Sequence, residues 1–176
     1  RFDTQEVTLN GESFFARAIY WEQDTPFTLS PDFLAIQWMR QNVEGSPVVM
    51  EAHTEQYHWG ARFSIYTGLP TIIGWPNHQK QQRGGFPLVV SQRARDVTEF
   101  YSTISSDQAM ELLQKYDVSY VVVGDLERIY YHTAGLDKFQ DMVARDSLAV
   151  AYDNGSTTVY KVEYTEISRA WAGPQR

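Results

Sequence analysis

The sequence predicts an α/β domain of three layers, with a mixed, mainly parallel sheet that ends in a C-terminal antiparallel hairpin. Segments with helical spacing of apolar residues alternate with short apolar runs around Val48, Ile72 and Val121. Such runs are typical of strands that helices cover on both faces. Asn154-Gly155, between two further apolar runs, is a strong hairpin signal. At 176 residues and 43% hydrophobic, the chain has the size and composition of one domain.

Two helix–strand pairs are expected in the first half. A helix from about Pro31 to Asn42 is indicated by Ser30, a good N-cap, and by the proline at the first helical position. The wholly apolar run Pro47 to Met50 then reads as a buried strand. A second helix is expected around Ala61, because Tyr57, Ala61 and Ile65 share one helical face, and a second strand at Thr71 to Ile73.

From Gly74 to Gln92 the regular spacing of apolar residues disappears, and the segment combines Gly and Pro with aromatic and polar side chains. Long irregular segments inside compact domains are uncommon and often functional. We therefore expect a binding site here. Its candidate substrate-binding residues are Trp75, Asn77, His78 and Arg83.

The second half repeats the alternation. Helices are expected from Arg93 to Thr103 and from Ser105, where Gln108 completes a capping box. Val118 to Val123 is the best candidate for the centre of the sheet. Leu148 to Asp153 and Ser156 to Val162 should form the closing hairpin towards an edge.

Polar clusters follow two of the predicted strands. Ligands of open α/β sheets bind beyond the carboxyl ends of strands, so these clusters belong to the predicted site. They add Glu51, His53, Asp125, Glu127 and Arg128 to the candidate substrate-binding residues.

Structural alternatives remain open for several of these residues. Trp75 can equally be a packed loop anchor whose indole N–H is satisfied internally. The charged residues of the second half can form an ordinary ion-pair network, since such networks are common. The residues concerned are Arg93, Arg95, Asp96, Glu127 and Arg128.

Composition and motifs exclude several familiar functions. The 15 Lys and Arg are outnumbered by 22 Asp and Glu, with no basic run, so a nucleic-acid partner is not expected. Neither a phosphate-binding glycine loop nor a G-x-S-x-G motif is present, there is no Cys, and the four His lack metal-ligand spacing. We expect no catalytic residue, metal site or cofactor in this chain.

No apolar run reaches the roughly 20 residues that span a bilayer, and the opening has neither an initiator Met nor signal-peptide features. The chain therefore reads as an excised fragment. We expect residues 1–176 to be one soluble domain, with an N-terminal extension at 1–29, an α/β core at 30–163 and a tail at 164–176.

The run from Tyr66 to His78, which includes Thr-Gly-Leu-Pro-Thr and Gly-Trp-Pro-Asn-His, resembles the C-terminal soluble part of the YYY-type multi-pass membrane proteins. The resemblance spans roughly Phe33 to Val162 and departs from the family pattern at Gln79 to Gln82, where an aromatic residue is expected. Further matches follow in the same order: Gln82-Arg83-Gly84, Arg95-Asp96-Val97, Leu112-Leu113, Tyr116, Val118, Tyr120 to Gly124, Glu127-Arg128, Tyr131 and Lys138-Phe139.

This resemblance implies a large polytopic protein laid out like the GT-C glycosyltransferases, with this domain at its C-terminal end on the extracytoplasmic face. More distantly, the chain resembles the soluble domain of oligosaccharyltransferase catalytic subunits. There a Trp-Trp-Asp loop helps to hold the acceptor peptide, and the metal-binding acids lie in the membrane part. Here Gly74-Trp75-Pro76-Asn77 takes the place of that loop, so its role does not transfer.

Two functions follow as hypotheses. In the first, the domain positions an acceptor or a lipid-linked sugar for a GT-C-like membrane glycosyltransferase and is not catalytic alone. In the second, it is a non-enzymatic interaction or structural module of a membrane protein. Its expected partners are its own transmembrane domain and a lipid-linked sugar or glycan acceptor.

Overall fold

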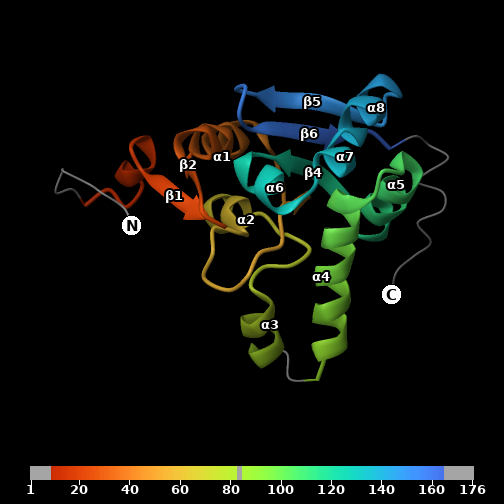
Figure 1. Ribbon diagram of the computed structural model, residues 1–176, viewed down its shortest axis with the longest axis horizontal. Coiled ribbons are helices and arrows are strands. Elements are labelled where there is room, and N and C mark those ends of the chain that lie inside the picture. Colours follow the sequence, from red (N-terminus) through yellow and green to blue (C-terminus); the bar gives the residue numbers. More distant parts are fainter. Residues whose placement is uncertain (1–8, 83–84, 165–176) are drawn as a thin grey trace.

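The computed structural model describes residues 9–82 and 85–164 (Figure 1). After an N-terminal hairpin, groups of helices alternate with one or two strands. In chain order the elements are η1 (Ser13–Ala16), β1 (Ile19–Glu22), β2 (Thr25–Thr28), α1 (Ser30–Asn42), β3 (Val48–Met50), α2 (Arg62–Thr67), α3 (Pro76–Gln82), α4 (Pro87–Ser102), α5 (Ser106–Lys115), β4 (Val118–Val123), α6 (Asp125–Tyr130), α7 (Thr133–Leu136), α8 (Lys138–Ala144), β5 (Leu148–Asp153) and β6 (Thr158–Val162).

A four-stranded mixed sheet forms the centre of the fold, in the order β3-β4-β6-β5. β4 pairs in parallel with β3 and antiparallel with β6, and β5 and β6 form the closing hairpin with β5 at the edge. The α/β class, the mixed sheet, the inner place of Val118–Val123 and the C-terminal hairpin are thus confirmed.

The expected predominance of parallel pairing is wrong. In the described chain, β3 with β4 is the one parallel pair between strands of this sheet. The predicted strand at Thr71 to Ile73 reaches the sheet only through a parallel bridge between Val49 and Thr71. The last two strands are joined by a tight turn, which imposes antiparallel pairing.

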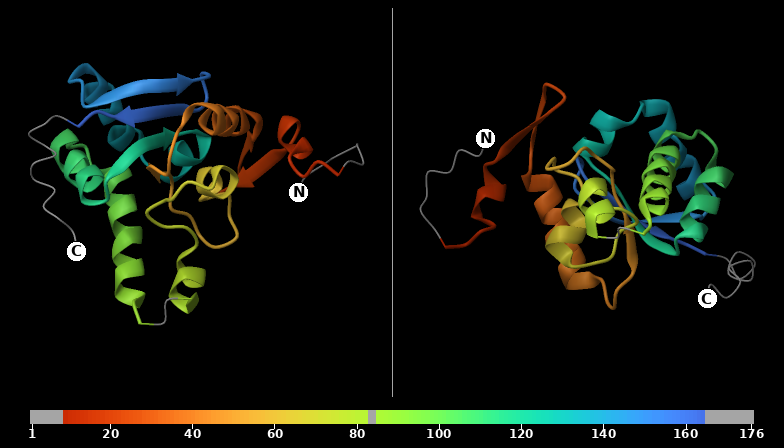
Figure 2. Two further views of the ribbon diagram at one scale, coloured as in Figure 1. Left: turned by 180° about the vertical axis from the view of Figure 1, so that it is seen from behind. Right: turned by 90° about the horizontal axis from the view of Figure 1, so that it is seen from below.

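Helices cover both faces of the sheet (Figures 1 and 2), which confirms the three layers. On one face, Val49, Val122 and Val159 pack with Ile36 and Met39 of α1. On the other, strand residues join side chains of α4, α5 and α8 in the larger apolar cluster, among them Met50, Val121, Leu148, Val97, Phe100, Leu113, Phe139 and Met142. Val121 and Val122 face opposite sides of the sheet, and both sides are buried, which explains why the run of β4 is apolar except for Ser119.

The N-terminal segment packs against this core. β1 and β2 form a separate antiparallel pair, and Phe15 of η1 is fully buried, with its ring stacked on Phe33 at a centroid distance of 4.5 Å. At the other end, the Tyr164 hydroxyl donates to the carbonyl oxygens of Leu113 and Val118. The rest of the expected tail lies outside the described residues.

The segment from Gly74 to Gln92 is more regular than expected, because α3 and the start of α4 lie within it. Each helix opens on a proline, Pro76 and Pro87, whose fixed φ suits the first helical turn. The Gln-Lys-Gln-Gln tract of α3 consists of good helix formers. In the described ranges, no helix is long and apolar enough to cross a membrane.

Lys138 opens α8 as a buried cation. Its Nζ donates to the carbonyl oxygens of Gly135 at 2.6 Å and Tyr101 at 3.4 Å, and no carboxylate of the described residues pairs with it. Burial therefore lowers the pKa of Lys138 to about 8, from an ordinary value of 10.5. Between these two values the unfolded chain binds more protons than the folded one.

This pKa shift predicts a pH dependence of stability. As pH rises from about 7.5 to about 9.5, Lys138 should raise the free energy of unfolding by about 2 kcal/mol, because the folded chain loses its proton first. In Lys138→Met this rise should vanish, whereas it should persist in Lys161→Met, whose side chain is exposed. Urea unfolding at several pH values measures it. An equal rise in Lys138→Met and wild type would contradict the assignment.

Candidate functional site

A buried arginine organises the region beyond the carboxyl ends of β3 and β4. Arg62, the first residue of α2, has no exposed side-chain surface. Its guanidinium donates to Asp32 of α1 through Nε, and to Glu127 of α6 through Nη2 at 2.8 Å and Nη1 at 3.1 Å. Burial alone would lower the pKa of Arg62, but the two carboxylates raise it well above its ordinary value.

Glu127 joins this arginine to the backbone. Its carboxylate also accepts from the N–H groups of Ala52 at 2.9 Å and Gly124 at 2.8 Å. Burial alone would raise the pKa of Glu127, but Arg62 and these donors bring it below its ordinary value. Glu127 therefore fixes the chain immediately after β3.

Glu51 fixes the other end of the segment between β3 and α2. Its carboxylate accepts from the N–H groups of Phe63 at 2.8 Å and Ser64 at 2.9 Å, at the start of α2. Burial raises the pKa of Glu51 and outweighs the effect of Arg62 and of these donors. Glu51 and Glu127 are buried and engaged in internal bonds that hold this segment in place, and their contact with a ligand stays a prediction.

The segment between β3 and α2 lines a cavity of about 430 Å³. The first residues of α3 line the opposite side of this cavity. The cavity brings together His53 and Asn77, two of the residues predicted from the sequence. Its complete lining is His53, Thr54, Glu55, Gln56, Tyr57, Pro76 and Asn77.

Three aromatic rings cluster beside this cavity. Tyr57, Trp75 and His78 lie with ring centroids 5.5 to 5.6 Å apart and mutually inclined planes. The Tyr57 hydroxyl and His78 Nε2 share a hydrogen bond of 3.2 Å. Tyr57 is 70% exposed, so most of its aromatic surface faces solvent. Trp75 and His78 are half-buried and support it.

Several nitrogens in the same region are buried without a hydrogen-bond partner among the described residues. They are His53 Nε2, Gln56 Nε2 and Trp75 Nε1, together with Trp59 Nε1. Burial also lowers the pKa of His53, which favours the neutral imidazole. Unpaired buried polar atoms are rare in folded proteins and are costly. Two of the four residues, His53 and Gln56, line this cavity, and Trp75 directly precedes its Pro76.

The other predicted site residues lie elsewhere. Asp125 and Arg128 pair at 3.6 Å on α6, and Arg128 also donates to the carbonyl oxygen of Ser156 in the turn between β5 and β6. Burial raises the pKa of Asp125, partly offset by Arg128. These contacts match the ion-pair alternative. Arg83 lies outside the described residues.

Tyr57 and Gln56 were missed because the sequence predicted a helix that included Tyr57. The helix begins only at Arg62, and Tyr57 itself has a left-handed backbone with φ of 63°. Such a conformation is uncommon for a bulky residue. Gly60 was the available signal, since a glycine indicates close approach of a neighbouring group.

In comparisons with known proteins, no protein-family model and no curated protein matches this chain. Among solved structures, it is similar to the C-terminal globular domain of an oligosaccharyltransferase from Archaeoglobus fulgidus, with a TM-score of 0.47 and 15% sequence identity. The alignment covers 74% of this chain and 95% of that domain. The likeness is distant, and the resemblance to the YYY-type proteins stays a prediction.

Gly60 provides a test of the cavity segment. A Cβ at this position would lie 2.2 Å from Oγ1 and 3.0 Å from Cβ of the buried Thr54. Gly60→Ala should therefore lower the free energy of unfolding by about 1–3 kcal/mol. Gly11→Ala, where nothing lies within 4 Å, should change it by less than about 0.5 kcal/mol. Equal effects of the two substitutions in urea unfolding would show that the segment is placed differently.

Proposed function

We propose that this chain is the substrate-positioning domain of a GT-C-like membrane glycosyltransferase, and that its cavity at His53–Tyr57 and Asn77 holds the sugar part of a lipid-linked sugar or glycan acceptor. The observation that carries the proposal is the combination at one cavity of an exposed aromatic surface with buried, unpaired nitrogens.

Sugars need this combination from a binding site. Their C–H faces pack against aromatic rings, while their hydroxyl groups need a few well-placed hydrogen-bonding groups. Here Tyr57 supplies the ring, and the Asn77 amide, Gln56 amide and neutral His53 imidazole supply donors and acceptors. At about 430 Å³, the cavity falls in the usual range for small-molecule sites.

In this proposal, the chain contributes binding and orientation, and the reacting groups belong to a membrane part of the same protein. Within the described residues, no group of three or more His, Asp or Glu side chains is arranged to hold a metal ion. The membrane attachment, the extracytoplasmic face and membership of the YYY-type family rest on the resemblance of Tyr66 to His78 and of the later matching residues.

A second candidate function is docking without ligand binding, as an interaction or structural module of a membrane protein. It is favoured by apolar side chains at the start of α4, where Phe86 and Leu88 are 64% and 81% exposed. Figure 1 shows that α3 and this end of α4 extend away from the sheet. The following experiment separates the two functions.

We expect the chain to bind simple saccharides in its cavity. Titration with glucose, mannose, N-acetylglucosamine and their short oligomers, followed by NMR, should shift the Trp75 indole N–H and the backbone signals of residues 53–57 saturably. Tyr57→Ala should weaken binding about tenfold, which corresponds to the loss of one aromatic contact of about 1.4 kcal/mol.

Trp21→Ala is the matched control, since Trp21 is also an exposed aromatic residue but lies on β1. This variant should bind as the wild type does. Shifts that are absent with every saccharide, or that Tyr57→Ala leaves unchanged, would contradict sugar positioning and favour the docking module.

A further inference from the structure

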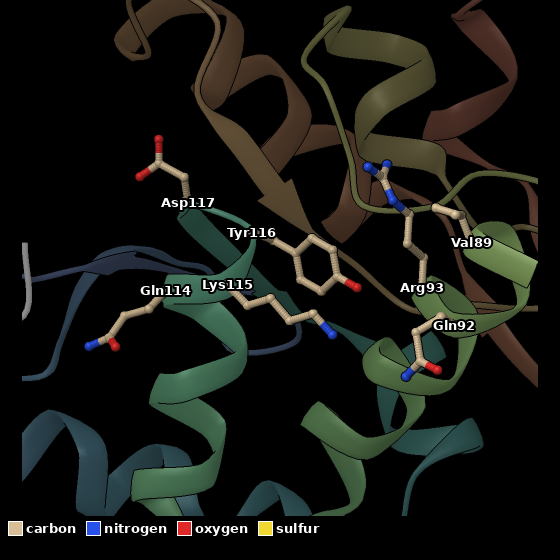
Figure 3. Close-up of a pocket in the computed structure, with 7 residues that line it drawn as sticks. All are labelled: Val89, Gln92, Arg93, Gln114, Lys115, Tyr116 and Asp117. Carbon is tan, nitrogen blue, oxygen red and sulfur yellow. The ribbon is translucent and has the colours of Figure 1, made fainter. Parts of the chain in front are cut away.

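A second cavity of about 660 Å³ lies between α4 and the end of α5 (Figure 3). It shares no lining residue with the first. α4 contributes Val89, Gln92 and Arg93, and the opposite wall consists of Gln114, Lys115, Tyr116 and Asp117. Figure 3 shows Arg93 and Gln92 facing Tyr116 and Lys115, while the Asp117 side chain points away from them.

Two cations flank one aromatic ring in this cavity. The Arg93 guanidinium carbon lies 5.8 Å from the centroid of the Tyr116 ring, and Lys115 Nζ lies 5.2 Å from it. Within the described chain, Arg93 has no ion pair, and its guanidinium donates to the Ile72 carbonyl oxygen at 3.2 Å. A guanidinium has five N–H donors, so most of its capacity remains for a ligand.

Asp96 forms an ion pair with the other cation, Lys115. Its carboxylate accepts from Lys115 Nζ at 2.6 Å, from Gln92 Nε2 at 2.7 Å and from the Tyr116 hydroxyl. Burial alone would raise the pKa of Asp96, but these donors bring it below its ordinary value. Asp96 is therefore ionised and holds Lys115, Gln92 and Tyr116 in place. The buried acid neutralises one of the two cations.

Among the described residues, Arg93 thus has no carboxylate partner on the cavity wall, because Asp117, the acid of the lining, points away from it. We infer that this cavity is a binding site for a singly charged oxygen anion, a carboxylate or a phosphodiester, attached to a group the size of a sugar ring. Arg93 binds the anion with its free N–H groups, and Lys115 adds a second point of attraction. Tyr116 and Val89 supply the apolar wall for the carbon part of the ligand.

The size and charge of the site both support this ligand. A volume of about 660 Å³ exceeds what a simple ion needs and lies within the range of small organic ligands. An oxygen anion would give Arg93 the charged hydrogen-bond partner that it lacks among the described residues. The site does not depend on the proposed function, because it involves other residues and another chemistry.

Glucuronate and glucose provide a direct test, since they differ by one carboxylate. In NMR titrations at low salt, glucuronate should shift the signals of α4 and Lys115–Asp117 saturably, and glucose should not. Diethyl phosphate, titrated in parallel, shows whether a phosphodiester binds in place of, or as well as, a carboxylate. Signals of residues 53–57 report the first cavity independently.

Arg93→Gln should weaken binding of the anion about tenfold or more, as expected for a lost hydrogen bond to a charged group. Lys115→Gln, at an exposed position, should also weaken binding of the anion. This variant tests the site if Arg93→Gln does not fold. Arg145→Gln changes the net charge equally but lies outside the cavity, and should bind as the wild type does. Equal shifts with glucose and glucuronate, no saturable shift with either anion, or unchanged affinity in Arg93→Gln and Lys115→Gln would overturn the inference.

Discussion

The structure depends on the placement of one buried positive charge. A guanidinium removed from water is stable only if carboxylates and hydrogen bonds surround it. Asp32 and Glu127 meet this need for Arg62, and so the starts of α1, α2 and α6 must lie together. The space is tight, because a Cβ on Gly124 would lie 2.8 Å from Asp32 Oδ1 and 3.0 Å from Arg62 Nη2.

The same cluster places the candidate site. Glu127 holds the backbone at Ala52, and Glu51 holds it at the start of α2, so the intervening segment is fixed at both ends. This segment carries Tyr57 into contact with the rings of Trp75 and His78. The buried acids thus act through position, because they hold the segment that lines the cavity and carries the exposed Tyr57 ring.

Local patterns predicted much of this fold. Val118–Val123 and the hairpin around Asn154-Gly155 were predictable because their signals are local. A run of apolar residues indicates a strand buried on both faces, and Asn-Gly between two apolar runs indicates a tight turn. The Arg62 cluster was not, since its partners are 30 and 65 positions away along the chain. For the candidate site, loop composition and strand ends predicted Trp75, Asn77, His78 and His53, which the structure places at or beside one cavity. It missed Tyr57, whose left-handed backbone interrupts an otherwise helical pattern.

The most direct test of the Arg62 cluster is a double-mutant cycle on the free energy of unfolding, with Arg62→Met, Glu127→Gln and the double variant. Each single substitution should cost about 3–5 kcal/mol, because it leaves a buried charge without its partner. The double variant should cost at least about 1.5 kcal/mol less than the sum of the two, since the residues are in direct contact. Single costs below about 1 kcal/mol, or simple additivity of the two, would contradict the central place of Arg62.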